Sequence, residues 1–332
     1  MDIRGRKVLV TGGAGFVGSH LVDSLAAQGC DIAVLDELSM GTEENLEQAR
    51  RNGNVSLVPG SVEDESLVRH LIVGEQRTVI FHLASLNLLR SVADPRRDLL
   101  VSVLGTLNVL QAMRESPMAS VMVFSSTGSV YGEPQYQPQD ERHPLEPVSP
   151  YGVSKLAAEK YVLLWHRLFG VKTVALRYYG VYGPRQNYGP HGGVVSIFAH
   201  RVLNGLAPVI EGAGDEERCF TYVEDVVRAN LLAAQTESAW GGVYNIGTTE
   251  IISIRGLADL VLELCHCMLE TTSAPRRVGN VAVFRPDISK AERYLGYRPT
   301  VPLMTGLRRT IDWFIQTGRA PAPAAPTGSR AD

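Results

Sequence analysis

The chain has 332 residues, of which 45% are hydrophobic, and its formal net charge is −3. This length allows one large domain or two domains that share a cleft. The slight negative charge provides no basic field for a nucleic acid or an anionic membrane, so we expect neither as a partner. No stretch approaches the ~20 apolar residues of a transmembrane helix, and residues 1–7 lack the apolar core of a signal peptide. We therefore expect a cytoplasmic protein.

Short apolar runs alternate with longer amphipathic runs over the first half of the chain. This alternation is typical of strands joined by crossover helices in a parallel sheet. Strands are predicted at residues 7–10, 31–35, 55–59, 78–82, 120–125 and 173–177. Residues 98–114 and 151–169 are predicted as helices, and Gly170 ends the second of them. Several apolar residues lie on the outer faces of these two helices, so we expect them to form the interface of a homodimer.

Glycine and proline pairs break the chain after residue 177 into loops and short elements. A helix at residues 224–236 and a strand at residues 243–246 are then predicted to return to the sheet.

Together these elements predict an α/β fold, with a doubly wound parallel sheet and a smaller C-terminal α/β domain. The sheet domain is expected to comprise residues 1–180 and about 222–247, and the smaller domain residues 181–221 and 248–317. The Pro- and Ala-rich residues 318–332 have nothing to bury and are expected to be disordered.

The four cysteines are too few for a disulfide framework and are not spaced as zinc ligands. Cys265, His266 and Cys267 form a run that resembles a group of metal ligands. The apolar pattern of residues 257–264 places this run in a helix, which would turn adjacent side chains onto different faces. We therefore expect no metal site.

A glycine-rich turn, residues 11–18, stands between the first predicted strand and a helical pattern. Gly12 permits the tight turn, Gly15 lets the backbone approach a pyrophosphate, and Gly18 lets the helix pack closely on the strand. Asp36 ends the second strand, where its carboxylate can accept both hydroxyl protons of an adenosine ribose and would repel a 2′-phosphate. The sequence therefore predicts a Rossmann-type domain that binds NAD in preference to NADP.

Tyr151 and Lys155 begin the second long helix one turn apart, on a single face. The ammonium favours the phenolate, and the positive charge of oxidised nicotinamide would lower the pKa of the tyrosine further. Tyr151 could then act as a general base near neutral pH. This spacing is common by chance, and it becomes specific because it follows the glycine turn, the acid and a strand that ends at Thr127.

With these motifs the chain resembles the extended short-chain dehydrogenases/reductases of the nucleotide-sugar epimerase and dehydratase family, from the N-terminus to about Phe314. The matching segments are residues 11–18, 36–41, 82–85, 125–132, 151–155, 177–186 and 218–225. The resemblance implies that Tyr151 is the base, that Lys155 binds the nicotinamide ribose and lowers the tyrosine pKa, and that Thr127 hydrogen-bonds the reacting sugar hydroxyl. The further cofactor contacts that it implies are Phe16, Val17, Glu37, Ser39, Gly41, Ser61, Val62, Leu83, Ala84, Ser85, Ser125 and Tyr178. The substrate contacts that it implies are Ser126, Gly128, Ser129, Gly180, Arg185, Val209, Arg218, Arg277 and Phe284.

Three reactions share this scaffold: 4-epimerisation, 4,6-dehydration and oxidative decarboxylation of a uronic acid. All three begin with hydride transfer from sugar carbon 4 to NAD. Dehydratases of the family carry an Asp-Glu pair directly after the catalytic threonine, where this chain has Gly128 and Ser129. Uronate decarboxylases carry a glutamate at the position of Ser129. The resemblance therefore implies a 4-epimerase, in which the 4-keto intermediate turns over and recovers the hydride. NAD is then expected to be tightly bound and regenerated in each turnover.

The resemblance places Arg218 and Arg277 where the family clamps the diphosphate of the substrate, which implies a UDP-sugar. Phe284 stands at a gatekeeper position, where a bulky ring disfavours an N-acetyl group. Gly180 replaces the usual asparagine, as in some glucuronate epimerases, so UDP-glucuronate is expected first and UDP-glucose second. Against glucuronate, Asn187 stands where one such group has an arginine for the carboxylate.

Other functions remain open. They are a decarboxylase or a 4,6-dehydratase on the same scaffold, a net reductase of a free ketone, and an NAD-sensing regulatory protein without catalysis.

Overall fold

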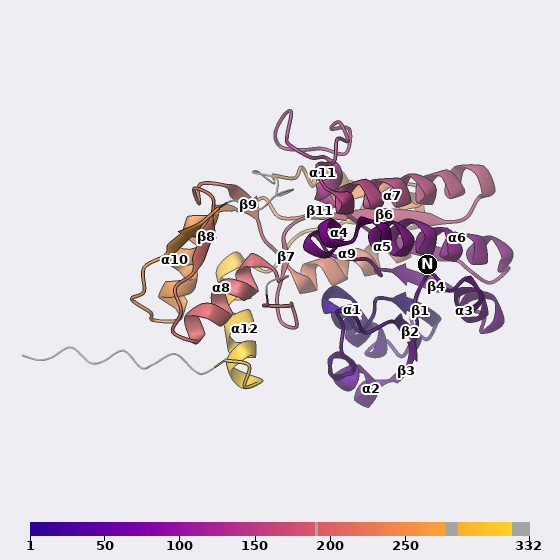
Figure 1. Cartoon of the computed structure of the whole chain (residues 1–332). Coiled ribbons are helices and arrows are strands. Elements are labelled where there is room, and N and C mark those ends of the chain that lie inside the picture. The colour runs from indigo at the N-terminus through magenta and orange to yellow at the C-terminus, as the bar shows by residue number, and fades with distance from the viewer. Residues whose placement is uncertain (190–191, 276–284, 321–332) are drawn as a thin grey trace, which may run out of the picture.

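The computed structural model describes residues 1–189, 192–275 and 285–320. Its centre is a seven-stranded sheet with the strand order β11-β6-β5-β4-β1-β2-β3, in which every pairing is parallel (Figure 1). The strands are β1 (Lys7–Thr11), β2 (Asp31–Asp36), β3 (Asn54–Pro59), β4 (Val79–His82), β5 (Val121–Thr127), β6 (Thr173–Tyr178) and β11 (Val243–Ile246). The strand order reverses between β1 and β4, which opens a crevice at the carboxyl ends of these strands. The predicted doubly wound sheet is confirmed.

Both faces of this sheet are covered by helices, which is why its inner strands are mainly apolar, whereas the edge strand β3 is partly exposed. Val8 and Val10 of β1 pack into the core under α1 (Phe16–Ala26) and α9 (Val223–Gln235), whereas Leu9 between them packs into the core under the opposite helices. Those helices are α3 (Glu65–Arg69), α6 (Gly105–Glu115) and α7 (Pro150–Phe169). The helices α2 (Glu47–Asn52), α4 (Leu88–Ala93), α5 (Pro95–Leu99) and α11 (Ser289–Leu295) lie around them.

The helix expected at residues 98–114 is interrupted. It consists of α5 and α6 joined by one widened π turn, Leu100–Leu104. The periodicity of the sequence predicts the helical stretch but not the widened turn, because one extra residue in a turn barely alters an apolar pattern.

A second apolar core gathers the elements drawn at the left of Figure 1. Its helices are α8 (Val194–Leu203), α10 (Ile254–Leu264) and α12 (Leu303–Gln316). Three two-stranded sheets accompany them: β7 (Val181–Tyr182) with β10 (Thr221–Tyr222), β8 (Val209–Glu211) with β13 (Thr272–Ala274), and β9 (Glu217–Cys219) with β12 (Ile251–Ser253). This separate core supports the predicted smaller domain.

Two local expectations are wrong. Helix α10 ends at Leu264, so the Cys-His-Cys run lies beyond the helix, where Cys265 is buried in the second core and His266 adopts a φ of 52°. Ala320, expected in the disordered tail, is also buried in that core, and its amide donates to Phe314 O at 3.2 Å. Residues 321–332 of the expected tail lie outside the described residues.

Two negative findings apply to the described residues alone. They contain no group of three His, Cys, Asp or Glu side chains that could hold a metal ion. In the same part of the chain, no helix is both long and apolar enough to cross a membrane.

Candidate active site

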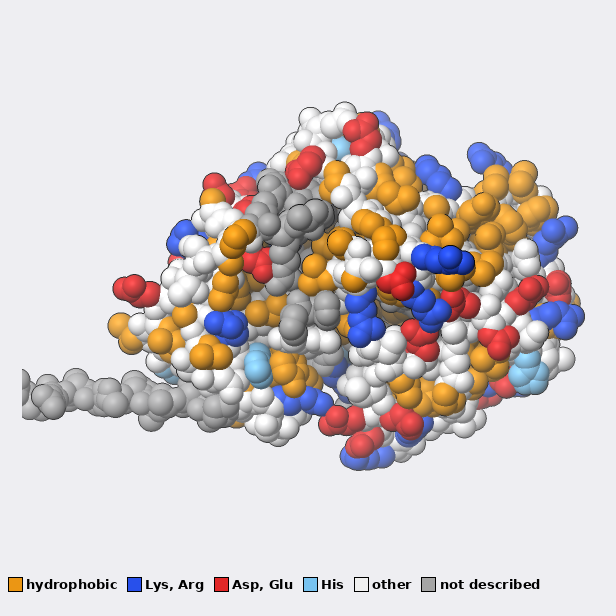
Figure 2. Space-filling view, in the orientation of Figure 1, with side chains coloured by type: hydrophobic (Ala, Val, Ile, Leu, Met, Phe, Trp, Pro, Cys, Tyr) orange, Lys and Arg blue, Asp and Glu red, His pale blue; other side chains and the backbone are white. Residues whose placement is uncertain are grey.

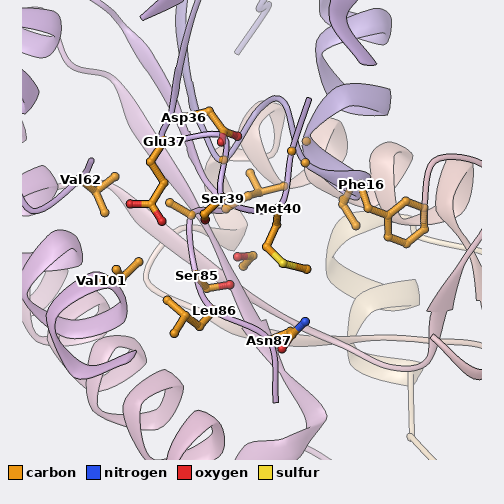
Figure 3. Close-up of a pocket in the computed structure, with 18 of the residues that line it drawn as sticks. Phe16, Asp36, Glu37, Ser39, Met40, Val62, Ser85, Leu86, Asn87 and Val101 are labelled. Atoms are coloured by element: carbon orange, nitrogen blue, oxygen red, sulfur yellow. The ribbon is translucent and has the colours of Figure 1, made fainter. Parts of the chain in front are cut away.

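A cavity of about 440 Å³ follows the carboxyl ends of the central strands, at the reversal of strand order (Figure 3). All of the residues predicted to contact the cofactor line this cavity, from the glycine turn at one end to Tyr178 at the other. Residues that the sequence argument missed also line it, among them Met40, Leu86, Val101 and Gln186. Gln186 could have been found from the sequence, because it is the last residue of the matching segment 177–186.

The glycine turn forms a cradle that side chains would fill. Gly12 has a φ of 69°, and a Cβ there would lie 2.8 Å from the backbone nitrogen of Ala84. A Cβ on Gly18 would lie 2.2 Å from Gly12 O. Gly15 precedes α1 and no side chain caps this helix, so the first amides of α1 can bind a diphosphate. The cradle therefore fits NAD as predicted from the sequence.

Asp36 is held in place at the end of β2 by two backbone amides. Its Oδ2 accepts from Ala14 N and its Oδ1 from Leu38 N, both at 2.9 Å. Burial raises the pKa of the Asp36 carboxyl, while these two amides lower it. Each carboxylate oxygen can accept a second hydrogen bond, which leaves capacity for the ribose hydroxyls.

Helix α7 meets the carboxyl end of β5. Tyr151 is buried within hydrogen-bonding reach of Thr127, and Lys155 Nζ donates to Ser125 O at 2.7 Å and to Ser125 Oγ at 3.3 Å. The Lys155 ammonium also lies 5.0 Å from the centre of the Phe124 ring. The predicted catalytic residues thus come together at the end of the cavity opposite Asp36.

The direction of the Tyr151 pKa differs from the one expected. Burial raises the pKa of Tyr151 to about 12, against the lowering effect of hydrogen bonding with Thr127. Burial likewise lowers the pKa of Lys155 to about 8. Lys155 donates to Ser125, and hydrogen bonding with Thr127 does not offset burial, so the protein groups alone do not favour the phenolate. The predicted lowering of the Tyr151 pKa therefore depends on the positive charge of oxidised NAD.

A buried ion pair lies directly behind this site. Arg177 donates to Glu159 through Nε at 2.9 Å and through Nη2 at 2.5 Å, and Ser126 Oγ donates to Glu159 Oε2 at 2.6 Å. Arg177 Nη1 also donates to Tyr131 Oη at 2.6 Å, and this hydroxyl donates to Asn245 Oδ1 at 2.7 Å. The network joins β5, α7, β6 and β11. It therefore fixes the strand that carries Thr127 relative to the helix that carries Tyr151.

A second cavity, of about 220 Å³, adjoins the first and extends toward the smaller domain. Thr127, Tyr178 and Gly180 line both cavities, whereas Ser129 and Arg218 line the second. The second cavity is therefore lined both by Thr127, a predicted catalytic residue, and by the arginine that is predicted to bind the diphosphate of the substrate.

Two glycines near this second cavity leave no room for a side chain. Gly180 has a φ of 51°, and a Cβ there would lie 2.0 Å from Cys219 O, so the asparagine usual in the family cannot fit without moving β9. A Cβ on Gly128 would lie 2.8 Å from a carbon of the Tyr179 ring. The aspartate that dehydratases carry at this position would therefore collide with Tyr179.

The remaining predicted substrate contacts are not all brought to the cavities. Arg185 lines the first cavity, but its guanidinium pairs with Asp23 of α1 at 2.7 Å. Val209 pairs with Thr272 in the strands β8 and β13 and lines neither cavity. Gly128 lines neither cavity and backs onto Tyr179.

The predicted contacts Arg277 and Phe284 lie outside the described residues.

Comparison with known proteins agrees with this geometry. Residues 9–310 match the family model described as GDP-mannose 4,6 dehydratase. The chain belongs to this family. Its fold and motifs are those of the NAD-dependent epimerases and dehydratases among the extended short-chain dehydrogenases/reductases.

Several relatives of the family are named epimerases. A putative UDP-glucose 4-epimerase of Methanocaldococcus jannaschii is 38% identical over 94% of this chain and 99% of its own length. A UDP-glucose 4-epimerase of Thermotoga maritima, solved with UDP-glucose, is 38% identical with a TM-score of 0.89, and covers 94% of this chain and 99% of its own. A protein named MoeE5, solved with UDP-glucuronic acid and NAD, is 30% identical with a TM-score of 0.84, over 94% of this chain and 99% of its own. The chain is accordingly an NAD-dependent member of the UDP-sugar 4-epimerase group.

Decarboxylases also occur among the relatives. A UDP-N-acetyl-alpha-D-glucosaminuronate decarboxylase of Bacillus cytotoxicus is 30% identical over 93% of this chain and 98% of its own length. Family membership alone therefore does not distinguish these reactions, and the residues of the site have to.

Proposed function

We propose that the chain interconverts the 4-epimers of an unacetylated UDP-hexose without net oxidation. The observation that carries the proposal is the site around Thr127, Tyr151 and Lys155. These three groups are present, while the two positions after Thr127 are Gly128 and Ser129, which supply neither acid nor base. These two positions therefore provide neither the acid-base pair that a dehydratase uses for elimination nor the glutamate of a decarboxylase.

Each catalytic residue has a separate task in this reaction. Tyr151 takes the proton of the sugar 4-hydroxyl as general base and returns it as general acid. Thr127, beside the phenol, accepts or donates a hydrogen bond at the same oxygen. Lys155 keeps a positive charge near the cavity, held in place by its bond to Ser125 O. When bound, NAD accepts the hydride of carbon 4 and gives it back.

Epimerisation also requires that the keto sugar present its opposite face to the cofactor. Apolar side chains, including Leu88, Val194 and Phe220, line much of the second cavity. Such walls hold a sugar through few directional contacts, because carbon atoms form no strong hydrogen bonds. A diphosphate fixed at Arg218 would then serve as the pivot about which the sugar turns.

The charge of the second cavity favours a neutral sugar. Among the described residues that line it, Arg218 is the only cation, and the diphosphate is its expected partner. Asn187 adds no positive charge for a carboxylate. We therefore place UDP-glucose and UDP-galactose first, in line with the relatives named UDP-glucose 4-epimerase.

UDP-glucuronate, the first expectation from the sequence, is the second candidate. Gly180 favours it, and so does the binding of UDP-glucuronic acid by the related MoeE5.

We also propose that the enzyme is a cytoplasmic homodimer. Large apolar side chains are exposed on α5, on the π turn that follows it and on α7, and Figure 2 shows hydrophobic side chains on the surface of the molecule in this region. They are Leu99, Leu104, Val153, Leu168 and Phe169. Exposed apolar surface is typical of sites of protein association, which is the basis for assigning the dimer interface to these helices.

The deciding experiment is incubation of the purified protein with UDP-glucose, UDP-galactose and UDP-glucuronate in separate reactions, without added reductant. Chromatography is expected to show one 4-epimer pair reaching equilibrium, with no net NADH formed. Carbon dioxide with a UDP-pentose would instead establish a decarboxylase, and a 4-keto-6-deoxy product a dehydratase. A Tyr151→Phe variant with unchanged turnover would contradict the assigned chemistry and favour a role without catalysis.

A further inference from the structure

One arginine on α5 joins two carboxylates beyond Asp36, at the end of the cavity where the adenosine of NAD is expected. Arg97 Nη2 donates to Glu37 Oε2 at 2.5 Å, and Arg97 Nη1 pairs with Glu63 Oε2. Glu37 directly follows β2, and Glu63 follows β3 by a few residues. A single guanidinium thus ties together α5 and the loops after two neighbouring strands.

These loops carry cofactor contacts themselves. Glu37, Ser61, Val62 and Val101 all line the cavity. In Figure 3, Glu37 extends from the end of β2 on the side where Val62 and Val101 lie. The bridge to Arg97 therefore spans the rim of the adenosine end rather than a remote part of the surface.

The backbone on both sides of the bridge is anchored. Asp94 caps α5 by accepting from the amide of Arg97 at 2.9 Å. Asn108 Nδ2 donates to Val62 O at 2.9 Å and to Glu63 O at 3.1 Å, and Ser61 Oγ donates to Glu63 Oε2 at 2.9 Å. These hydrogen bonds hold the segments that carry Arg97 and Glu63 in place.

We propose that Arg97 is a cofactor-retaining residue, whose two ion pairs close the cavity over the adenosine and slow the release of NAD. The guanidinium fork suits this task because it can hold one carboxylate on each terminal nitrogen. Retention matters in a reaction that returns its hydride, since each molecule of NAD serves many turnovers. The proposal rests on NAD binding and does not depend on which sugar is the substrate.

The charges around the bridge also favour retention of NAD. Asp36 and Glu37 line the adenosine end of the cavity, Glu63 follows Val62, which also lines it, and Arg97 pairs with Glu37 and Glu63. Its removal leaves uncompensated carboxylates near a cofactor that carries a diphosphate. Loss of the bridge and like-charge repulsion would therefore both speed NAD release.

The test measures NAD release from the holoenzyme. Protein loaded with isotopically labelled NAD is mixed with excess unlabelled NAD, and the label that remains bound is followed over time. Release from Arg97→Gln is expected to be roughly tenfold faster than from the wild type, from the loss of two partly exposed ion pairs. Arg96→Gln is the matched control. Arg96 adjoins Arg97 on α5, is exposed and has no ion pair within the described part of the chain, so its release rate should stay within about twofold of wild type.

Ionic strength separates a bridge from a general structural effect. Raising the NaCl concentration should speed NAD release from the wild type and from Arg96→Gln, because salt screens ion pairs, and should do so much less for Arg97→Gln. Equal release rates for the two variants, or equal salt dependence, would overturn the proposal.

Circular dichroism checks the fold of each variant. If Arg97→Gln does not fold, Glu63→Gln tests the same bridge from its other side, and release at the wild-type rate would again refute the proposal. A protein that retains NAD yet epimerises no UDP-sugar would refute the proposed reaction and leave this inference intact.

Discussion

Replacing Glu159 with glutamine tests how strongly the ion pair behind the active site holds this region together. Glu159 has no exposed surface, and its oxygens accept two hydrogen bonds from Arg177 and one from Ser126. A neutral amide keeps one acceptor oxygen but turns two donor hydrogens toward these donors. The guanidinium then stays buried without a counter-charge. Removing one partner of a buried ion pair costs about 3–5 kcal/mol, so we expect Glu159→Gln to lower the free energy of unfolding by about that amount.

Urea unfolding followed by circular dichroism measures this loss. Glu115→Gln is the matched control, because it removes the partner of Arg69 from an exposed ion pair of 2.7 Å and should cost less than about 1 kcal/mol. The double variant Glu159→Leu with Arg177→Met should recover part of the stability, since no unpaired charge then remains buried. If Glu159→Gln lowers the free energy of unfolding no more than Glu115→Gln does, the ion pair between Glu159 and Arg177 does not hold this region together.

The same variant should also slow catalysis. Ser126, which donates to Glu159, adjoins Thr127, so loss of this contact frees the strand that positions the reacting sugar hydroxyl. We expect the turnover number to fall roughly ten- to hundredfold while NAD remains bound. Turnover at the wild-type rate by a folded, NAD-loaded variant would show that the network does not position the site.

Three further predictions concern the cofactor turn, the pH dependence and the dimer. Gly18→Ala places a Cβ 2.2 Å from a backbone carbonyl oxygen of the glycine turn, so NAD binding, measured by titration calorimetry, should weaken at least tenfold; unchanged affinity would show that the turn can adjust. The pKa of Tyr151, raised to about 12 by the protein, means that the basic form gains population as pH rises, whereas Lys155, with its pKa lowered to about 8, loses its positive charge above that pH. The turnover number should therefore rise with pH and then fall above about pH 8, and a profile that keeps rising beyond that point would exclude a role for the ammonium. Val153→Glu should convert the dimer to a monomer in light scattering, whereas Leu206→Glu, equally exposed on the smaller domain, should leave it a dimer.

Much of the fold could be predicted from the sequence because its signals are local. A strand of the central sheet is buried on both faces and reads as a short apolar run, and the helices between strands show their own period. The glycine turn and Asp36 belong to a single strand-turn-helix-strand unit, and Tyr151 and Lys155 lie one turn apart on one helix. Such spacing is visible without knowledge of any distant contact. The widened turn between α5 and α6 and the early end of α10 were not visible, since packing decides them and the apolar pattern continues past both.

Only the tertiary structure decided which distant residues meet. Arg97 reaches Glu37 and Glu63 across three separate segments, and Glu159 receives the hydroxyl of Ser126 from another strand. Pairings of this kind leave no periodicity, because each residue alone looks like an ordinary charged or polar position. The pKa of the catalytic tyrosine is a further example: the spacing to a lysine is a property of the sequence, but the burial that raises the pKa arises from the packing of α7 on β5. The sequence by itself thus determined the cofactor and predicted the candidate catalytic groups, whereas the packed structure determined how tightly the site is held and how it is charged.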